Sequence, residues 1–379
     1  MTEIAKIVRE AVEKEGVISF AEFMRLALYC PKYGYYEQAR GRIGRTGDFY
    51  TNVSTGSLFS DLLGFQFVQR LQGLSGKTFQ LVEAGANDGQ LASDILGFLS
   101  QRQPAHFRSL AYWIIEPSAR QQARQRATLE HFAGQVLWFD SLDALPAASV
   151  SGIIFSNELL DAMPVYRLGW DASTRRWFEW GVTIADPLLA KQAGGGLGVS
   201  FVWAKIPRPA DFLANELSQA GLELPAQVMT ALPHEFILEI CPAAAVWWGQ
   251  AALRLKQGKL LTIDYGFPAS RFLIPERTGG TLRAYHGHRS SANLLAQVGE
   301  QDLTAHVNFT QLMRAGESAG LITDGLFSQE RFLTKIAAQA WPKPGEFGTL
   351  TSARLRQFQT LTHPEQLGQR FSVLLQKRA

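Results

Sequence analysis

The sequence predicts an α/β fold built on a doubly wound, mostly parallel sheet. Apolar runs of strand length occur at residues 79–84, 111–115, 136–139, 152–155 and 259–263. Stretches with helical spacing separate the runs, and each run ends in polar or acidic residues. Buried strands that alternate with helices are typical of parallel sheets, and such sheets bind ligands at the carboxyl ends of their strands. We therefore expect a ligand site at this edge.

The composition is that of a globular chain. It has 379 residues, of which 46% are hydrophobic and 19% charged, with a formal net charge of +3. This length allows two domains or one elaborated domain, and the charge is too small to indicate tight binding to nucleic acid. Cys30 and Cys241 lie far apart and match no metal-binding spacing. We expect no metal site and a reducing compartment.

The location of the protein is predicted from two further observations. No apolar run approaches the ~20 residues that a membrane-spanning helix needs. Residues 1–15 contain Glu3, Glu10, Glu13 and Glu15, and this is too acidic for a signal or transit peptide. We expect no membrane span and a cytoplasmic protein.

The most informative stretch surrounds the end of the first predicted strand. Glu83 stands near that end, and Gly85, Asn87 and Gly89 follow in a tight turn before an amphipathic helix. Glycine permits positive φ and lets backbone N–H groups approach a ligand, while the helix N-terminus favours negative charge. The stretch predicts a site for a carboxylate or phosphate. The alternative is an ordinary glycine-rich turn between a strand and a helix.

Two further strand ends extend this candidate site. Glu116 ends the run at 111–115, where an acid can accept hydrogen bonds from both ribose hydroxyls. Ser141 and Leu142 follow the next run, at the position where adenine is commonly held. The alternative for Glu116 is a solvated charge at the end of a strand. On the helix that follows, we expect a solvated face formed by Arg120, Arg124 and Arg126.

A second group of acids follows the run at 152–155. Asn157 and Glu158 stand at its carboxyl end. If a helical turn follows, Glu158 and Asp161 face the same side and form a paired acid site that could hold a cationic substrate or take up a proton. The alternative is capping of a helix by Asn157 and Glu158. His306, in a later loop, is the histidine to consider for chemistry, although a lone loop histidine more often only forms hydrogen bonds.

The remaining segments divide the chain into three parts. Residues 1–75 are predicted to form N-terminal helices and a glycine- and tyrosine-rich loop that covers the cofactor site. Residues 76–165 and 236–379 form the cofactor domain, in which a helix is expected over 238–255. Residues 166–235 form an inserted antiparallel ribbon and a substrate region. The ribbon carries three tryptophans that either pack on its sheet or dock a partner, namely Trp177, Trp180 and Trp203.

The candidate site favours S-adenosylmethionine (SAM) as its cofactor. The phosphate-binding pattern GxxxxGK[ST] does not occur in the sequence. A glycine-rich loop, a ribose acid and a polar strand end on the adenine side suit SAM, whose carboxylate can meet the loop N–H groups and whose cationic groups favour nearby acids. The sequence therefore predicts methyl transfer.

Seven motifs, which run in order across nearly the whole chain, resemble those of the MidA-like family of SAM-dependent methyltransferases. The motifs are Tyr33-Gly34-Tyr35-Tyr36, Gly47-Asp48-Phe49-Tyr50-Thr51, Glu83-Ala84-Gly85, Glu116-Pro117-Ser118, Asn157-Glu158-Leu159-Leu160-Asp161-Ala162-Met163-Pro164-Val165, Ile263-Asp264-Tyr265-Gly266 and Asp302-Leu303-Thr304-Ala305-His306-Val307-Asn308-Phe309. The family's mitochondrial member is a complex I assembly factor that methylates arginine.

The resemblance implies a class I SAM-methyltransferase-like Rossmann sheet with an N-terminal helical region and an inserted β-ribbon or lid region. It implies SAM contacts from Gly47, Asp48, Phe49 and Thr51 and a cofactor contact from Asn157. Asp48 and His306 join Glu158 and Asp161 as candidate catalytic residues. Its substrate would be an arginine of a protein, such as a subunit of a respiratory complex, and a homodimer is left open.

The chain departs from the family pattern at two places. Asn87 stands where the family has glycine, and the turn should survive because asparagine tolerates positive φ. Val53 and Ser54 stand where the family has Pro-Glu, so a role of that glutamate is in doubt here. This departure leaves open an assembly protein that binds SAM without transferring a methyl group. Within the enzymes, a small-molecule N- or O-methyltransferase is the second alternative.

Overall fold

The core of the molecule is a mostly parallel sheet. The computed structural model describes residues 2–38, 51–76, 78–185, 200–206, 208–287 and 289–378. Within these residues an eight-stranded sheet has the order β15-β16-β10-β5-β2-β3-β4, with β14 paired to β10 outside this path. All pairings from β10 to β4 are parallel, and β16 is antiparallel to both neighbours. The predicted α/β sheet is confirmed. Its strands are β2 (Phe79–Ala84), β3 (Leu110–Ile115), β4 (Val136–Phe139), β5 (Val150–Asn157), β10 (Leu255–Phe267), β14 (Val307–Asn308), β15 (Ile322–Ser328) and β16 (Phe371–Arg378).

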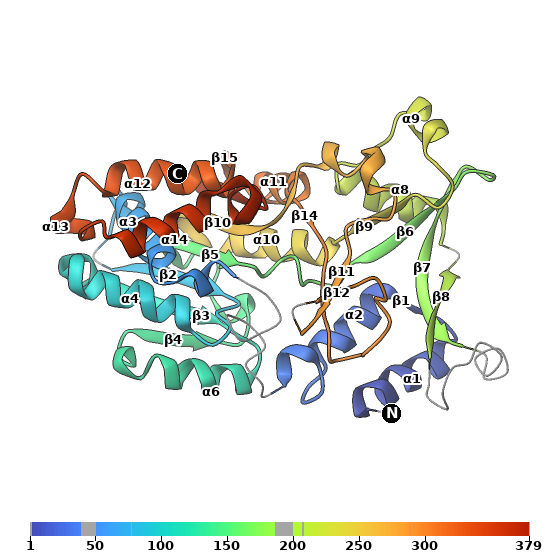
Figure 1. Cartoon of the computed structure of the whole chain (residues 1–379), viewed down its shortest axis with the longest axis horizontal. Coiled ribbons are helices and arrows are strands. Elements are labelled where there is room, and N and C mark those ends of the chain that lie inside the picture. Colours follow the sequence, from blue (N-terminus) through green and yellow to red (C-terminus); the bar gives the residue numbers. More distant parts are fainter. Residues whose placement is uncertain are drawn as a thin grey trace.

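Helices cover both faces of this sheet (Figure 1). On one face, α3, α4, α12 and α14 pack on alternate strand residues such as Leu81, Phe155 and Val373. On the other face, α10 and α11 pack on the intervening residues, including Val82 and Ile154. Two apolar layers therefore bury every central strand, which explains the nearly continuous apolar runs. The helices of this part are α3 (Leu58–Leu71), α4 (Gln90–Arg102), α5 (Pro104–Arg108), α6 (Ala119–Thr128), α10 (Pro242–Arg254), α11 (Phe309–Ser318), α12 (Gln329–Ala340), α13 (Pro344–Phe347) and α14 (Ser352–Thr362).

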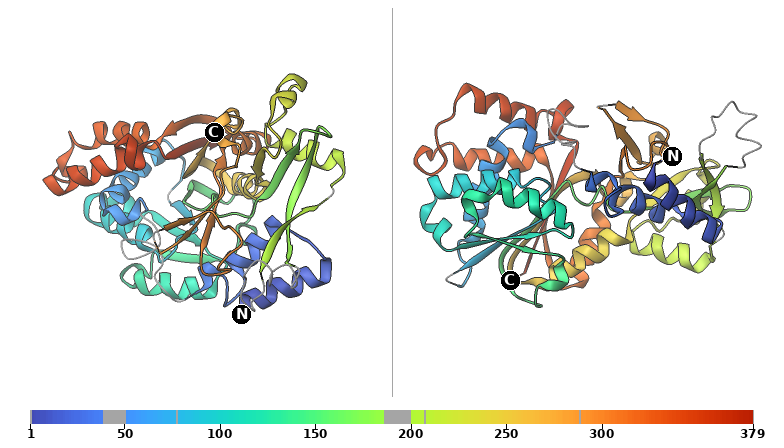
Figure 2. Two further views of the ribbon diagram at one scale, coloured as in Figure 1. Left: turned by 45° about the vertical axis from the view of Figure 1, so that its right-hand side comes forward. Right: turned by 90° about the horizontal axis from the view of Figure 1, so that it is seen from below.

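A second lobe is built from antiparallel strands (Figures 1 and 2). One sheet has the order β1-β7-β6-β9 with β8 paired to β7, and a small sheet has the order β12-β11-β13. The predicted ribbon corresponds to the β6-β7-β8 pairings. The elements are α1 (Glu3–Glu15), β1 (Ile18–Ser19), α2 (Phe20–Tyr29), β6 (Tyr166–Asp171), β7 (Arg176–Ile184), β8 (Phe201–Ile206), α8 (Ala210–Gln219), α9 (Ala226–Ala231), β9 (Ile237–Ile240), β11 (Arg283–His286), β12 (Arg289–Ser291) and β13 (Asp302–Thr304).

Residues 238–240 differ from expectation because they form strand β9, which pairs antiparallel with β6, and the helix begins only at Pro242. The three ribbon tryptophans pack inside this lobe. The Trp177 ring lies 5.3 Å from that of Trp170, and the Trp203 ring lies 5.2 Å from that of Phe20 and 6.4 Å from that of Trp180. The packing alternative therefore describes these side chains.

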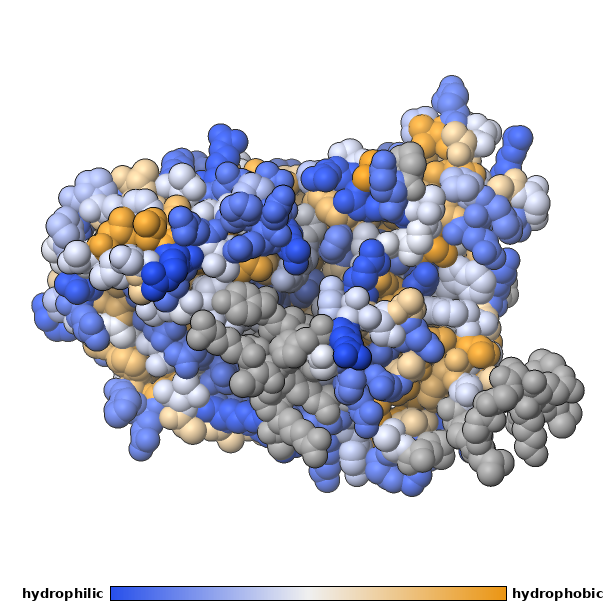
Figure 3. Space-filling view, viewed as in Figure 1, coloured by the Kyte–Doolittle hydropathy of each residue, from blue (hydrophilic) through white to orange (hydrophobic). Residues whose placement is uncertain are grey.

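The surface offers both polar and apolar areas. On the face shown in Figure 3, hydrophilic residues prevail, and apolar patches gather mainly on the lobe that carries β7 and β8. Val202 of β8 is 39% exposed. None of the helices in the described ranges is both long and apolar enough to cross a bilayer.

The centre of the main sheet leaves no room for a side chain at Gly152 of β5. A Cβ atom there would lie 2.0 Å from the Gln80 carbonyl oxygen on β2. We predict that Gly152→Ala lowers the free energy of unfolding in urea by at least about 1–3 kcal/mol, because the backbone must move. The control is Gly249→Ala in α10, where nothing lies within 4 Å and alanine should stabilise the helix by up to about 1 kcal/mol. Equal effects of the two substitutions would contradict the sheet register.

Candidate functional site

The glycine-rich turn joins β2 to α4 in the conformation that its residues favour. Gly85, Asn87 and Gly89 all have positive φ, at 72°, 48° and 86°. Gly89 is the N-cap residue that directly precedes α4. A Cβ atom on Gly85 would lie 2.8 Å from Leu159 Cδ1, so the turn has no space for a side chain at this position. Asn87 replaces the expected glycine without disturbing the turn, because asparagine tolerates this region of φ.

Glu83 lies just before this turn and is only 2% exposed. The Tyr112 hydroxyl donates a 2.6 Å hydrogen bond to its Oε2. Burial raises the pKa of Glu83 to about 7. The carboxyl group of Glu83 is thus hydrogen-bonded to the neighbouring strand β3. Its contact with a cofactor stays a prediction.

Glu116 follows β3, and its two carboxyl oxygens are held by different donors. The Ser118 backbone N–H donates to Oε1 at 3.0 Å, and Gln125 Nε2 donates to Oε2 at 3.0 Å. Gln125 also donates to the Asn87 carbonyl oxygen at 3.0 Å. This fully buried glutamine therefore connects the glycine-rich turn to the predicted ribose acid. Sequence reasoning missed Gln125 because its position on α6 carries no motif.

The adenine-side residues follow β4. Ser141 is exposed and starts a 3-10 turn, while Leu142 is 3% exposed and packs in the apolar layer beneath α10. The structure places both near the edge formed by the ends of β3 and β4. No contact tests their assignment to the cofactor, which stays a prediction.

The acids after β5 lie in a turn and not at the start of a helix. Glu158 has φ of 53°, and no helix begins at Asn157 or Glu158. The alternative in which these two residues cap a helix is therefore wrong. Instead, Asp264 at the end of β10 accepts hydrogen bonds from the backbone N–H groups of Leu159 and Leu160, at 3.2 and 2.8 Å. The Asp264 carboxylate thus satisfies the N–H groups of this turn and fixes the shape of the loop.

Four acidic side chains converge at this turn. Asp161, Asp264 and Asp302 are 6%, 0% and 1% exposed, and Glu158 is mostly buried. Burial raises the pKa of Glu158 to about 8 and that of Asp264 to about 7. The pKa of Asp161 is raised well above its usual range, first by burial and then by the charges of Asp264, Asp302 and Glu158. The carboxyl group of Asp161 therefore lies within reach of the charges of the other three. Only Asp302 comes from the second lobe.

The segment that begins at Thr51 reaches this acid cluster through Asn52, which is fully buried. The Asn52 backbone N–H donates to Glu158 Oε1 at 3.3 Å, and its Nδ2 donates to Asn157 Oδ1 at 3.4 Å. Gln329 Nε2 of α12 donates to Asn52 Oδ1 at 2.8 Å. Ser54, at the position of the family's glutamate, donates its hydroxyl to the Thr51 carbonyl oxygen at 2.8 Å. Ser54 thus shapes the turn at Thr51.

Three predicted site residues, Gly47, Asp48 and Phe49, lie outside the described residues. His306, the predicted histidine, lies within the described residues, and its backbone hydrogen bond and ring contact involve none of the four acids. Its ring packs edge-on against Phe267 at 4.9 Å, and its Nδ1 is buried with no hydrogen-bond partner in the described part of the chain. Burial, followed by the charges of Arg277 and Arg283, lowers the pKa of His306 to about 4. It is neutral at pH 7 and a weak base.

Two tyrosines, Tyr29 at the end of α2 and Tyr36 from the tyrosine-rich loop, form a wall beside Asp302 and the segment after Asp161. The Tyr36 hydroxyl donates to Asp302 Oδ1 at 2.8 Å, and the Tyr29 hydroxyl donates to the Ala162 carbonyl oxygen at 2.9 Å. Their ring centroids lie 5.4 Å apart. The motif Tyr33-Gly34-Tyr35-Tyr36 marked this segment, but it did not reveal its partner Asp302.

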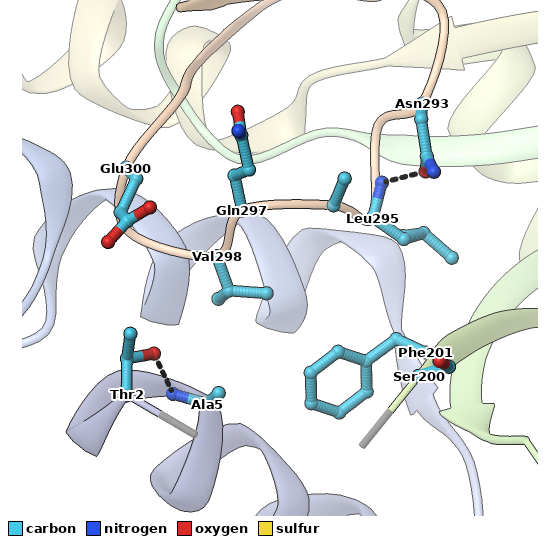
Figure 4. Close-up of a pocket in the computed structure, with 10 residues that line it drawn as sticks. Thr2, Ala5, Ser200, Phe201, Asn293, Leu295, Gln297, Val298 and Glu300 are labelled. Atoms are coloured by element: carbon cyan, nitrogen blue, oxygen red, sulfur yellow. Dashed lines mark hydrogen bonds between the residues drawn. The ribbon is translucent and has the colours of Figure 1, made fainter. Parts of the chain in front are cut away.

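A separate cavity of about 300 Å³ lies between the start of α1, the start of β8 and the loop around residues 293–300 (Figure 4). Thr2 and Ala5 line it from α1, and Phe201 from β8. None of the predicted site residues lines it. This cavity is distinct from the turn at Gly85 and from the acid cluster.

The raised pKa of Glu158 has a consequence for stability. An acid whose pKa is higher in the folded protein binds protons more tightly there, so its contribution to stability is full below pH 4.5 and is lost as pH rises through about 8. We predict that Glu158→Gln reduces the fall of the melting temperature between pH 5 and pH 9. Glu130→Gln, an exposed acid, serves as the control. Identical pH profiles of wild type and Glu158→Gln would contradict the burial of this charge.

Comparisons with known proteins agree with this architecture. Crystal structures of two proteins from Burkholderia thailandensis superpose with TM-scores of 0.80 and 0.78, at 29% and 30% identity, and each covers 99% of this chain. This chain covers 92% and 91% of them, and the first contains bound S-adenosyl-homocysteine. They confirm the Rossmann-like fold and SAM as the cofactor.

Curated relatives match over nearly the full chain. One from Drosophila melanogaster, named protein arginine methyltransferase NDUFAF7 homolog, mitochondrial, is 28% identical over 98% of this chain and 84% of its own length. The Homo sapiens protein of the corresponding name is 26% identical over 95% and 80%. Because these relatives are named mitochondrial, the expected cytoplasmic location is wrong. Cysteine usage and an acidic N-terminal stretch do not determine the compartment.

The match to a protein family covers more than half of the chain. A model of a family of S-adenosyl-L-methionine-dependent methyltransferases matches residues 62–327. This range runs from α3 to β15 and includes the glycine-rich turn, Glu116 and the acids after β5. The chain therefore belongs to this family, and the protein is a SAM-dependent methyltransferase.

Proposed function

We propose that this protein transfers the methyl group of SAM to an arginine side chain of a protein. The observation that carries the proposal is the acid cluster. Glu158, Asp161 and Asp264 form no ion pair with any lysine, arginine or histidine in the described ranges. Buried carboxylates without a cation are costly, and a guanidinium group would supply that charge. The names of the curated relatives, all protein arginine methyltransferases, support the same substrate.

The cofactor would lie between the two groups of residues described above. Gly85 and Gly89 adopt positive φ and form a tight turn directly before the N-terminus of α4, where the helix dipole suits the SAM carboxylate. Glu116 would accept hydrogen bonds from the ribose, and Ser141 and Leu142 would flank the adenine. Glu83, Asn87, Asn157 and Thr51 would complete the site, together with residues 47–49.

SAM, when bound, supplies an electrophilic methyl group on a cationic sulfonium. The transfer forms a bond between this carbon and an arginine nitrogen, breaks the carbon–sulfur bond and releases one proton from the guanidinium. Glu158 and Asp161 would orient the guanidinium by charge-assisted hydrogen bonds. A carboxyl group with a pKa of about 8, as in Glu158, is well suited to receive the proton near neutral pH. His306 has no part in this scheme because its ring packs against Phe267.

The identity of the acceptor protein, including a subunit of a respiratory complex, rests on the resemblance alone, as does a homodimer. Labelled SAM incubated with a cell lysate distinguishes the functions. Label in a protein that yields methylarginine on hydrolysis supports the proposal. Label only in the small-molecule fraction would identify a small-molecule methyltransferase, and binding of SAM without any label would identify an assembly protein.

Substitution of Glu116 tests the placement of the cofactor. Glu116→Ala should weaken the binding of S-adenosyl-homocysteine ten-fold or more, because each hydrogen bond to a charged group contributes roughly 1.5–3 kcal/mol. Gly85→Val should weaken it further, since the new side chain would collide with Leu159 and resist positive φ. Titration calorimetry measures both effects, with Glu130→Ala as the control. Unchanged affinity in both variants would refute the placement.

Substitution of Glu158 tests the acceptor site. Glu158→Gln keeps the size and polarity of the side chain but removes the charge, so kcat/KM for methyl transfer to protein should fall ~100-fold or more. The affinity for S-adenosyl-homocysteine should stay within about two-fold of wild type, because the site of the loss is the acceptor. Glu130→Gln should transfer normally. Full methyl transfer by Glu158→Gln would remove Glu158 from the acceptor site.

A further inference from the structure

Helix α6 binds three consecutive carbonyl groups of the N-terminal segment. Gln121 Nε2 donates to the Tyr36 carbonyl oxygen at 2.8 Å, and Arg120 Nη1 donates to that of Glu37 at 2.7 Å. Arg124 Nη2 donates to the carbonyl oxygen of Gln38 at 2.9 Å. The expectation of a solvated arginine face is therefore wrong for the half-buried Arg124, and Arg120, although exposed, also binds the segment. We call these three donors, Arg120, Gln121 and Arg124, the α6 clasp.

The same helix holds the predicted ribose acid. The Ser118 side chain caps α6, while its backbone N–H donates to Glu116 Oε1. Gln125, one turn after Gln121, donates to Glu116 Oε2 and to the Asn87 carbonyl oxygen. A short helix with these contacts moves as one body. Any ligand that fixes Glu116 therefore also fixes the α6 clasp.

The clasped segment in turn carries the wall of the acid cluster. Tyr36 contributes its carbonyl oxygen to the clasp and its hydroxyl group to Asp302. Its ring packs on that of Tyr29, whose hydroxyl group bonds to the carbonyl oxygen of Ala162, the residue after Asp161. A continuous set of contacts thus joins Glu116 to Asp161. Its links are hydrogen bonds, one ring contact, the backbone of α6 between Gln121 and Gln125, and the peptide bond between Asp161 and Ala162.

We propose that Arg120, Gln121 and Arg124 are positioning residues that couple cofactor binding at Glu116 to the Tyr29–Tyr36 wall of the acceptor site. The proposal rests on the cofactor role of Glu116 proposed above and not on arginine as the acceptor. With the cofactor bound, Tyr29 and Tyr36 should leave their positions beside the acid cluster less often. The acceptor would then bind a site in which both tyrosines are in place. Such coupling is reciprocal. Loss of the clasp should therefore lower the binding affinity for the cofactor by the same factor by which bound cofactor stabilises the wall.

Hydrogen exchange of the whole chain, with and without S-adenosyl-homocysteine, tests this coupling. In the wild type the ligand should slow exchange in peptides that cover residues 29–38 by about five-fold or more. In Arg120→Ala/Arg124→Ala this slowing should be lost, and the dissociation constant of the ligand should rise by a similar factor. Arg126→Ala is the matched control, because its guanidinium lies over the Trp138 ring at 4.1 Å and not on the segment. It should retain the wild-type slowing.

Two results would overturn the proposal. One is binding of S-adenosyl-homocysteine to the wild type with no change in exchange over residues 29–38. The other is full slowing in the double variant. If the double variant fails to fold, Arg120→Ala alone provides the test, since Arg120 is exposed and its loss leaves α6 intact. No acceptor is present in this assay, so its outcome is independent of the arginine assignment. If Glu116→Ala binds S-adenosyl-homocysteine normally, the proposed placement of the cofactor is wrong, and this result does not test the α6 clasp.

Discussion

Asp264 accepts hydrogen bonds from the backbone of Leu159, Leu160 and Tyr265, and the geometry of the acid cluster follows from these three bonds. In most α/β units a helix follows a strand such as β5, and the first N–H groups of that helix have no partner within it. Here a buried carboxylate satisfies the N–H groups after β5, so the chain can turn at once and present Glu158 and Asp161. The carboxyl end of β10 thereby determines the shape of the loop after β5, its parallel neighbour.

Segments from distant parts of the chain close on that loop. Asn52 approaches Glu158 from the segment before α3 and is supported by Gln329 of α12. The backbone N–H of Ala305, between β13 and β14, donates to the carbonyl oxygen of Asp161 at 2.8 Å. Each of these contacts satisfies a buried polar group, and none of them places a described lysine, arginine or histidine in an ion pair with Glu158, Asp161 or Asp264. The second lobe is thus part of the site through its main chain as much as through its side chains.

Local chemistry explains which features the sequence predicted. The strands of the main sheet are apolar on both faces, and the turn at Gly85 needs residues that tolerate positive φ, so both are visible in the sequence. Long-range partners are not. Glu158 resembles a capping residue until Asp264 is seen to replace the helix, and Arg120 resembles a solvated residue until the Glu37 carbonyl is found beside it. Residues 238–240 resemble a helix entry because only their pairing with β6 makes them a strand.

Both the oxygen and the nitrogen of the Gln125 side-chain amide form hydrogen bonds, and a further consequence follows from this. Its oxygen accepts a hydrogen bond from Trp138 Nε1 at 3.0 Å, while its nitrogen serves Glu116 and Asn87. The amide therefore cannot rotate to suit a new neighbour without releasing the indole. Tryptophan emission responds to the hydrogen bonding of its N–H group, and Trp138 is half-buried in β4, the strand that follows α6. The molecule thus contains a natural optical reporter, joined by a single side chain to the carboxylate that we place against the ribose.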